Sequence, residues 1–360
     1  MRLAIFGLTV SSSWGNGHAS LWRGLIGALL AEGHRVTFFE RDVPYYAANR
    51  DLTRLGDGGE LVLYADWAEV LPHARRTLAA CDAALVTSFC PDGVPAGVLI
   101  QDSPAVCCCF YDMDTPVTLA LLAGNGSVPW LGSEGLGAYD LVLSFTGGGA
   151  ITELERQLGA RCAEPLYGWA DPAVYRPVPI LSHYAGRLSY LGTYAEDRQA
   201  ALVRLLVEPA RQRPDDRFVI AGAQYPEDFP WSGNIFFVRH LPPAEHAAFF
   251  CSSGLTLNVT RAEMRRMGWC PSGRLFEAAC CGTPVLSDRW DGLGDFFEPG
   301  DEILVADDTE AAMAALDLPD ETLRAIGRRA RDRALARHTA RHRAQRLIQL
   351  IEQTPTRKGS

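Results

Sequence analysis

The feature that most constrains the fold of this chain is an alternation of short apolar runs with helical segments. Near the N-terminus, the apolar run Arg2–Leu8 is followed by helical periodicity over Ala19–Glu32 and by a second apolar run over Arg35–Glu40. Both runs are continuously apolar, which is typical of strands that helices cover on both faces of a parallel sheet. The pattern therefore predicts a doubly wound α/β architecture.

The same alternation continues through both halves of the chain. In the first half we expect further strands at Leu61–Tyr64, Ala83–Thr87, Ala105–Tyr111 and Leu141–Phe145. In the second half we expect strands at Arg187–Leu191, Phe218–Gly222, Ile235–Val238, Leu255–Val259, Pro284–Ser287 and Ile303–Val305. The segment Pro165–Pro179, rich in proline and glycine, separates the two halves.

A length of 360 residues fits about two domains. We expect a first domain over residues 1–170, a second over residues 171–335 and a C-terminal helix over residues 336–360. In doubly wound domains, ligands bind at the carboxyl ends of the strands. The functional site is therefore expected at those ends in both domains.

Composition excludes several classes of function. The formal net charge of −9 argues against nucleic-acid binding, because such binding depends on an excess of basic side chains. The 10 cysteines form no Cys-x-x-Cys pair and read as buried thiols, so neither a metal site nor a disulfide framework is expected. No signal peptide or apolar run of membrane-spanning length is apparent, which favours a cytoplasmic protein.

The C-terminal region is rich in arginine between Arg324 and Arg346. Two interpretations are open. The arginines could form a solvated helix face, or they could bring the protein into peripheral contact with an anionic membrane surface.

In the first domain, the loop after the first strand could approach a ligand. It contains Trp14, Gly15, Asn16 and Gly17, and His18 follows at the expected start of a helix. The free N–H groups of such a helix start favour an anionic or polar ligand. Alternatively, His18 only caps the helix.

A dinucleotide site is an alternative interpretation of the same loop. Gly15 and Gly17 are followed by Ser20, so the Gly-x-Gly-x-x-Gly fingerprint is incomplete. Glu40, at the end of the second strand, could hold a ribose, which keeps a nicotinamide-dependent oxidoreductase open as an alternative.

Further candidates follow two other strands of this domain. Asp112, directly after a buried strand, could act as a general base on a hydroxyl group. Asp114 could also face the ligand, or it could cap a helix that begins near Thr115. Thr146 and Gly147 follow the next strand, where they could hold an anionic group or form a tight turn.

The second domain carries the most informative segment, Asn258 to Val305. Ser272 and Gly273 open a short helix that bears Arg274 and Glu277. The free N–H groups of that helix start, together with Arg274, would form a cradle for a diphosphate. Glu277, one turn further along, could accept hydrogen bonds from a ribose diol.

These residues carry a resemblance to a known family. The segments GRLFEAACCGTPVLSD and FFEPGDEILVA resemble the nucleotide-sugar-binding segment of family 4-like GT-B glycosyltransferases. More closely, SSSWGNGHA, YDMDTPVTLA, PLYGWADPAVYRPV, LSYLGTYAEDRQ and LNVTRAEMRRMGWCPSGRLFEAA resemble the CgeB-type spore-maturation glycosyltransferases. PLYGWADPAVYRP is similar to the stretch between the domains of that family, with its closing aromatic-x-Pro.

The resemblance implies a GT-B fold, in which two Rossmann-like doubly wound domains face each other across a cleft. The first domain would bind the acceptor and the second domain the donor. The C-terminal helix would cross back to the first domain.

The resemblance also implies residue roles. Glu277 is similar to the second glutamate of the family's Glu-x7-Glu motif, which holds the donor ribose. The position of the first glutamate is occupied by Trp269, so other groups must contact the donor sugar. The donor-binding residues implied are Gly192, Thr193, Arg198, Arg239, His240, Leu241, Arg261, Ser272, Gly273, Arg274, Leu275, Phe276 and Glu277.

The predicted function is that of a metal-independent, hexosyltransferase-like glycosyltransferase. It would use a nucleoside-diphosphate sugar as co-substrate, require no cofactor and modify an unidentified acceptor. His18 and Asp112 are the predicted catalytic residues. The alternatives are a nucleotide-sugar epimerase of the same fold and a non-catalytic binding or structural protein.

Overall fold

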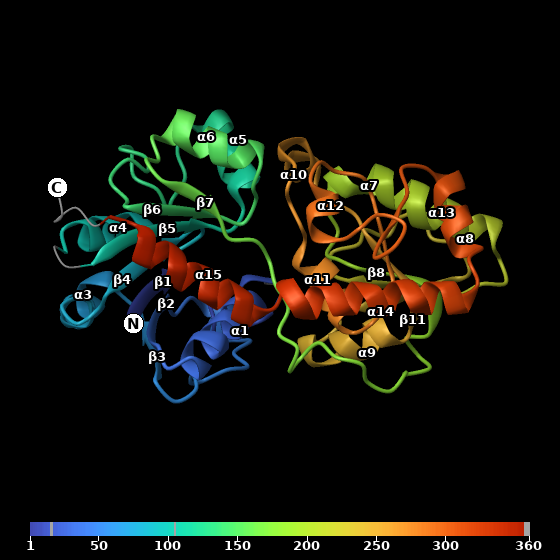
Figure 1. Ribbon diagram of the computed structural model, residues 1–360, viewed down its shortest axis with the longest axis horizontal. Coiled ribbons are helices and arrows are strands. Elements are labelled where there is room, and N and C mark those ends of the chain that lie inside the picture. Colours follow the sequence, from blue (N-terminus) through green and yellow to red (C-terminus); the bar gives the residue numbers. More distant parts are fainter. Residues whose placement is uncertain (15–16, 104–105, 356–360) are drawn as a thin grey trace. The chain divides into compact units, whose positions relative to one another are not determined.

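The computed structural model describes residues 1–14, 17–103 and 106–355, and the chain forms two compact units (Figure 1). One unit comprises Met1–Tyr167 and the chain from Ala340 onward, and the other comprises Gly168–Thr339. The boundaries therefore differ by a few residues from the expected 170/171 and 335/336. The reason is a pairing inside the second unit, where the N–H of Ala170 donates to the carbonyl of His338 at 3.1 Å and Ala170 forms a bridge with Thr339.

The first unit is built on a seven-stranded parallel sheet in the order β3-β2-β1-β4-β5-β6-β7. Its strands are β1 Arg2–Gly7, β2 Arg35–Arg41, β3 Gly59–Tyr64, β4 Ala83–Thr87, β5 Cys107–Asp112, β6 Leu141–Ser144 and β7 Ala163–Pro165. Its helices are α1 Gly17–Ala31, α2 Pro44–Ala47, α3 Trp67–Leu78, α4 Gly93–Gln101, α5 Thr115–Asn125, α6 Gly149–Leu158 and α15 Ala340–Gln353. The short edge strand β7 was not anticipated.

The second unit is built on a six-stranded parallel sheet in the order β10-β9-β8-β11-β12-β13. Its strands are β8 Gly186–Leu191, β9 Phe218–Gly222, β10 Ile235–Arg239, β11 Ser253–Asn258, β12 Val285–Ser287 and β13 Leu304–Val305. Its helices are α7 Glu196–Leu202, α8 Glu208–Gln212, α9 His246–Cys251, α10 Ala262–Met267, α11 Gly273–Cys280, α12 Leu293–Phe296, α13 Thr309–Leu316 and α14 Asp320–Arg337. A wider helical turn over Val203–Val207 joins α7 to α8.

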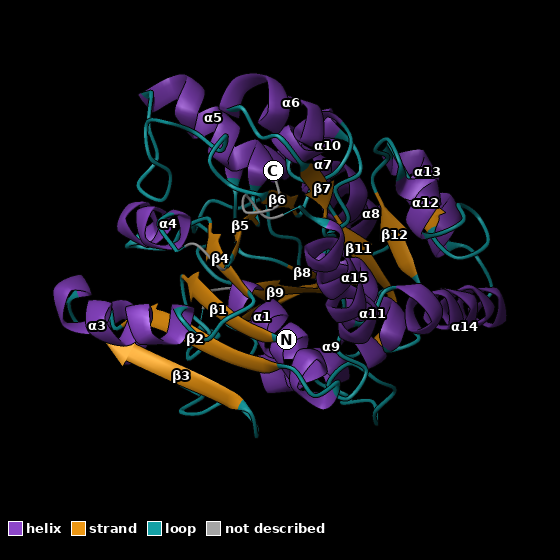
Figure 2. Cartoon of the chain, turned by 60° about the vertical axis from the view of Figure 1, so that its left-hand side comes forward, coloured by secondary structure: helices purple, strands orange, loops and turns teal. Residues whose placement is uncertain are grey.

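The central strands of both sheets are buried on both faces, as their continuous apolar sequences predict. Strands β4, β5 and β9 are buried at every position. Figure 2 shows helices beside the strands of each sheet. In the first sheet, β2 and β3 lie on one side of β1 and the later strands on the other. In the second sheet, β9 and β10 lie on one side of β8 and the later strands on the other. The strand order therefore switches direction at β1 and at β8. The loops at the carboxyl ends of these strands are the expected ligand-binding positions of such folds.

Helix α15 packs against α1 within the first unit (Figure 1). The buried side chains Leu347, Leu350 and Ile351 supply its apolar face. Arg341 Nε donates to Glu32, at the end of α1, at 3.1 Å. These contacts explain why the chain from Ala340 onward belongs to the first unit.

Several arginines of the C-terminal helices hydrogen bond inside their own units. Arg331 donates to the carbonyl of Cys280 at 3.1 Å, Arg333 pairs with Glu302 at 2.9 Å and Arg346 pairs with Glu164 at 3.1 Å. Through these contacts, the three arginines connect the C-terminal helices to the rest of their units. None of the helices among the described residues is both long and apolar enough to span a membrane.

The loop after β1 is held by a buried carboxylate. Glu40, on β2, is fully buried, and four groups of the loop donate to it. Thr9 Oγ1 and Ser11 Oγ donate to Oε1 at 2.7 and 2.6 Å, and the N–H groups of Val10 and Ser11 donate to Oε2 at 2.7 and 2.9 Å. Both oxygens of Glu40 are therefore committed to the loop.

This arrangement removes the basis of the oxidoreductase alternative. A carboxylate that holds a ribose must present a free oxygen to the ligand, and Glu40 presents none because the loop itself occupies the site. The correct role of Glu40 is to set the path of the chain that leads into α1.

A second carboxylate secures the end of the same loop. Asp51 accepts hydrogen bonds from the N–H and hydroxyl of Ser13, and Arg23 of α1 donates to it. Burial tends to raise the pKa of Asp51, but the hydrogen bonds from Arg23 and Ser13 lower it to about 2. Arg23 also donates to the carbonyl of Val10 at 2.8 Å, so loop and helix are joined directly.

We expect Glu40→Gln to destabilise the protein by about 3 kcal/mol, because an amide cannot accept from all four donors and leaves buried N–H groups unsatisfied. Urea-induced unfolding followed by tryptophan fluorescence measures the change. Asp57→Asn, on the exposed loop before β3, is the matched control and should change stability by less than about 0.5 kcal/mol. Equal stability of the two variants would contradict this role of Glu40.

Candidate functional site

The first unit brings His18 and Asp114 together. His18 lies at the start of α1, and its Nε2 is 3.0 Å from Oδ2 of Asp114, which immediately precedes α5. The two side chains are 16% and 23% exposed, so both are accessible from solvent. The expected alternative role of Asp114 was a helix cap, but its side chain makes no capping hydrogen bond to α5. The carboxylate is oriented toward the histidine instead.

An aromatic side chain borders this pair. The ring of Phe89, which follows β4, lies 5.7 Å from the ring of His18. Phe89 has a φ of 62°, a left-handed conformation that is strained for a bulky residue and is often found at functional sites. The strain turns this ring toward the histidine.

Asp112 lies behind the pair. It is fully buried at the end of β5, and its Oδ1 accepts from the N–H of Asp114 at 3.1 Å and from Thr118 Oγ1 at 3.0 Å. Its Oδ2 has no hydrogen-bond partner among the described residues. Burial raises the pKa of Asp112 to about 7. In this position Asp112 holds the start of α5, and thereby Asp114, but does not itself face solvent.

The other residues expected on the acceptor side differ in exposure. Trp14 is 40% exposed and Gly17 is exposed, whereas Thr115 and Thr146 are fully buried. Gly147 is required by packing, because a Cβ there would lie 2.3 Å from the hydroxyl of Tyr167. Gly15 and Asn16 lie outside the described residues. The accessible part of the predicted set is therefore Trp14, Gly17, His18 and Asp114.

In the second unit, the residues predicted to hold a diphosphate lie at the start of α11. Ser272 caps the helix, accepting from the N–H of Arg274 at 3.3 Å. Arg274 and Glu277 are both partly exposed, one turn apart on the same face of α11. Leu275 and Phe276 are buried in the core, with side chains at most 1% exposed. A ligand can therefore meet only the backbone of these two residues.

The surroundings of Glu277 act on its charge. Burial raises the pKa of Glu277, while the charge of Arg274, one turn earlier on the same helix, counteracts that rise.

A second arginine faces the same region from α7. Arg198 donates to the carbonyl of Thr193 at 2.6 Å, and its buried Nε has no partner among the described residues. Arg198 and Arg274 both act electrostatically on the hydroxyl of Tyr225, which donates to the carbonyl of Gly192 at 3.2 Å. Both guanidinium groups therefore lie near enough to this hydroxyl for their charges to act on it. Arg261 pairs with the residue before Arg198 on α7, since its Nε lies 3.6 Å from Oδ2 of Asp197.

The carboxyl ends of β8 and β9 approach each other closely. A Cβ on Gly222 would lie 2.0 Å from the carbonyl oxygen of Gly192, so only glycine fits at this position. The two strand ends are therefore in direct backbone contact.

The segment after β10 holds the residues predicted to contact the base. Arg239 is exposed and ends the strand, Leu241 is buried, and His240 adopts a left-handed φ of 53°. His246, at the start of α9, was missed by sequence reasoning. Burial and the charge of Arg274 lower the pKa of His246 to about 4, so this ring is neutral near pH 7.

Trp269 occupies the position expected for the first glutamate of the Glu-x7-Glu motif. Its φ is 43°, its N–H donates to the carbonyl of Asp291 and its Nε1 donates to Asp295, both at 2.6 Å. Gly292 packs against the indole ring, because a Cβ there would lie 2.5 Å from it. The tryptophan is thus firmly held by the segment that follows β12.

Asp288, at the carboxyl end of β12, was also missed. It is 2% exposed, and its Oδ1 accepts from the N–H and the hydroxyl of Thr260 at 3.0 and 2.8 Å. Burial raises the pKa of Asp288 to about 6. Asp288 directly follows a buried strand, as Asp112 does. The same criterion applied to the sequence would have identified Asp288 as a candidate.

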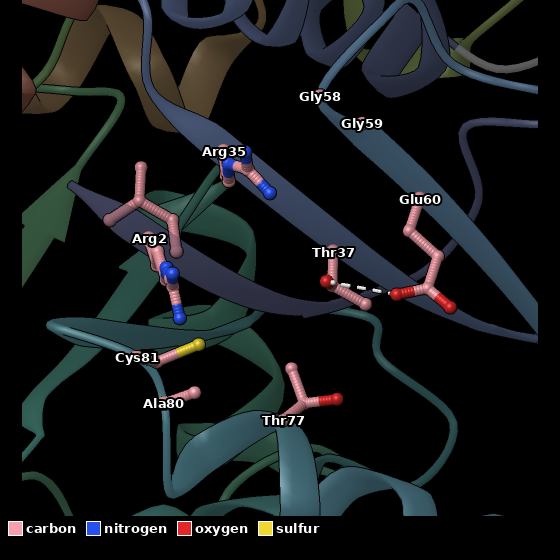
Figure 3. A pocket seen from close by; sticks show the side chains of 10 residues that line it. Arg2, Arg35, Thr37, Gly58, Gly59, Glu60, Thr77, Ala80 and Cys81 are labelled. Carbon is pink, nitrogen blue, oxygen red and sulfur yellow. Dashed lines mark hydrogen bonds between the residues drawn. The ribbon is translucent and has the colours of Figure 1, made fainter.

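A cavity of about 370 Å³ lies at the amino ends of the strands of the first sheet, opposite the edge that holds His18 and Asp114. Its lining includes Arg2 of β1, Arg35 and Thr37 of β2, and Glu60 of β3, all near the amino ends of their strands (Figure 3). Thr37 Oγ1 donates to Glu60 at 3.4 Å across it. The cavity therefore does not coincide with the residues at the carboxyl ends. No group of three or more His, Cys, Asp or Glu side chains in the described part of the chain is arranged to hold a metal ion.

Comparison with known proteins supports the reading of the second unit. A family model described as glycosyl transferase-like matches residues 198–349. We found no match among curated protein sequences.

Solved structures match over the length of the chain. Sucrose-phosphate synthase from Thermosynechococcus elongatus has a TM-score of 0.71 at 16% identity, with 98% of each chain covered. An α-glucosyltransferase in complex with UDP and a 13-mer DNA containing an HMU base has a TM-score of 0.69 at 13% identity, covering 98% of this chain and 100% of that one. Anabaena HepE in complex with UDP-glucose has a TM-score of 0.67 at 11% identity, covering 98% and 99%.

At these identities, the similarity to solved structures establishes the architecture. The chain has the two-domain GT-B fold, and residues 198–349 match a glycosyl transferase-like family model; together these findings support a glycosyltransferase.

Proposed function

We propose that this protein transfers a sugar from a nucleoside-diphosphate sugar to a hydroxyl group of an acceptor, as a member of the CgeB-like glycosyltransferases. The observation that carries the proposal is the start of α11. There a capped helix, Arg274 and Glu277 lie on one accessible face of the glycosyl transferase-like domain.

The donor is proposed to bind with its diphosphate at the start of α11 and its ribose at Glu277. Helix N–H groups and a guanidinium both favour a phosphate anion. When the bond between the anomeric carbon and the diphosphate oxygen breaks, negative charge grows on the leaving group. Arg274 and Arg198 would stabilise that charge, so the proposed reaction needs no metal ion.

The acceptor hydroxyl is proposed to lose its proton to His18. Nε2 of the ring lies 3.0 Å from Oδ2 of Asp114, and a carboxylate paired with an imidazole stabilises the ring once it has taken up a proton. As the acceptor oxygen bonds to the anomeric carbon, its proton passes to the imidazole of His18 and the nucleoside diphosphate departs. Asp112, which the sequence suggested as a catalytic residue, is assigned a positioning role behind Asp114 because it is fully buried.

Uridine nucleotides are the first donors to test, because two of the similar structures contain UDP or UDP-glucose. The test is a thermal-shift and calorimetry panel of UDP, GDP and ADP with their sugar derivatives. A ligand at about 100 times its Kd stabilises the folded protein by about 2.7 kcal/mol. We expect one nucleotide series to raise the Tm by several degrees. If none of these nucleotides or nucleotide sugars raises the Tm, the proposed donor site is contradicted.

Glu277→Ala should weaken binding of that nucleotide about tenfold or more, because a charge-assisted hydrogen bond to the ribose is lost. Its own Tm without ligand should remain close to that of the wild type. Unchanged affinity by calorimetry would refute the ribose role.

His18→Asn should lower the rate of sugar transfer about 100-fold or more, while donor affinity stays unchanged, because only the general base is removed. Release of nucleoside diphosphate in the presence of a panel of hydroxyl acceptors measures the rate. His73→Asn replaces a histidine on α3 that pairs with Glu60 at 3.6 Å, and it should transfer at the wild-type rate. Equal rates for both variants would exclude His18 as the base, and donor turnover independent of acceptor would favour an epimerase.

A further inference from the structure

We propose that the cavity at the amino ends of β1, β2 and β3 binds a small organic phosphate that also carries hydroxyl groups, such as a sugar phosphate. Two arginines hold the phosphate, and a carboxylate beside a threonine holds the hydroxyl groups. The cavity lies at the other end of the sheet from His18 and Asp114, and the matched family model covers only residues 198–349. Binding at this cavity does not depend on the proposed transfer of a sugar.

The face of the sheet that carries this cavity changes from apolar to polar toward the strand starts. Alternate residues of a strand share a face, so Arg2 lies on the same face as Phe6, and Arg35 lies on the same face as Phe39. The two phenylalanine rings stack at 4.7 Å within the core. The cavity lies beyond these rings, where α3, which covers this face, ends at Leu78.

Two arginines stand at paired positions of neighbouring strands. Arg2 of β1 and Arg35 of β2 are partners in the parallel register, and both line the cavity with exposed side chains. In the described part of the chain, neither guanidinium group has a hydrogen-bond or ion-pair partner, and Asp82 accepts from the backbone N–H of Arg2 at 2.7 Å instead. Like charges at such positions repel each other, and a phosphate between the two guanidinium groups would pair with both.

The other side of the cavity carries groups suited to hydroxyls. Thr37 Oγ1 donates to Glu60 at 3.4 Å across β2 and β3, and the same carboxylate lies 3.6 Å from His73. Both contacts are long and the Glu60 side chain is 54% exposed, so the carboxylate can accept further hydrogen bonds. Figure 3 shows Arg2, Arg35 and Thr37 around one open space, with Glu60 at its side. A ligand with both a phosphate and hydroxyl groups would satisfy both sides of the cavity, whereas a bare anion would meet only the arginines.

The rest of the lining is small and uncharged. Gly58, Gly59 and Ala80 leave room for a ligand, and Thr77 adds a hydroxyl group from the last turn of α3. Burial raises the pKa of Cys81 to about 11, so this thiol carries no negative charge near pH 7 that would oppose an anion. The volume of about 370 Å³ is within the range of sites for small molecules.

Calorimetry of the full chain with glucose 6-phosphate, glycerol 3-phosphate, inorganic phosphate and glucose tests the site. We expect at least one of the two organic phosphates to bind at a single site with a Kd below about 1 mM, inorganic phosphate to bind more weakly, and glucose not to bind. Arg2→Gln and Arg35→Gln should each weaken the organic phosphate about tenfold or more, because a charge-assisted hydrogen bond is lost. Arg156→Gln makes the same change of charge on α6, away from the cavity, and should bind as the wild type does.

Glu60→Gln separates the two sides of the site. The loss of a nearby negative charge should leave inorganic phosphate bound equally or more tightly, whereas the preference for the organic phosphate over inorganic phosphate should fall about threefold or more. The Tm of each variant without ligand should stay close to that of the wild type, because the substituted side chains are exposed.

Three results would contradict the proposal. If neither organic phosphate binds the wild type, the cavity is not a site for this class of ligand. If Arg2→Gln and Arg35→Gln bind as tightly as the wild type, the phosphate is held elsewhere. If the preference for the organic phosphate is unchanged in Glu60→Gln, the hydroxyl groups are not held by Glu60. None of these results depends on nucleotide binding at α11, so they leave the proposed function to its own tests.

Discussion

The parallel pairing of the strands is the constraint on which the rest of this structure depends. Because every strand of a sheet runs in the same direction, all the loops that leave the carboxyl ends meet at one edge. In the first unit that edge gathers the loop after β1, Phe89, Asp112 and Asp114, although they are far apart in the sequence. In the second unit it gathers Gly192, Gly222 and His240 with the start of α11. Left-handed residues directly after β4 and β10 turn the chain sharply at this edge.

Carboxylates at these ends serve two different purposes, and hydrogen bonding separates them. Glu40 and Asp112 are fully buried and accept hydrogen bonds from the loops that follow β1 and β5. These hydrogen bonds fix the backbone of the two loops. Asp114 and Glu277 are partly exposed, and Asp114 meets the side chain of His18. A partly exposed carboxylate held by one side chain keeps an oxygen available to a ligand.

Much of the architecture was predictable from the sequence, because continuous apolar runs identify buried parallel strands. The start of α11 was predictable for a local reason, since serine, glycine and arginine in succession define a capped helix with a basic first turn. It was less evident which residues of α11 pack into the core and which face outward. Leu275 and Phe276 face the core, while Arg274 and Glu277, three residues apart, face outward, and the order of residues alone does not show which side of a short helix packs.

Features that depend on contacts between distant residues were not predictable. Glu40 seemed available to a ribose because nothing local shows that the loop after β1 folds back onto it. Asp112 seemed the better base because its burial depends on the neighbouring strands. The boundaries of the two units differ from the predicted ones because Ala170 pairs with Thr339. The composition of the connecting segment does not indicate such a pairing.

The central claim is that the start of α11 binds the donor nucleotide, and a crystal structure with the bound nucleoside diphosphate tests it most directly. The account predicts the diphosphate at the N–H groups of Gly273 and Arg274, and the ribose hydroxyls within hydrogen-bonding distance of Glu277. A nucleotide bound at the loop after β1, or in the cavity between Arg2 and Arg35, with the start of α11 empty, would contradict it.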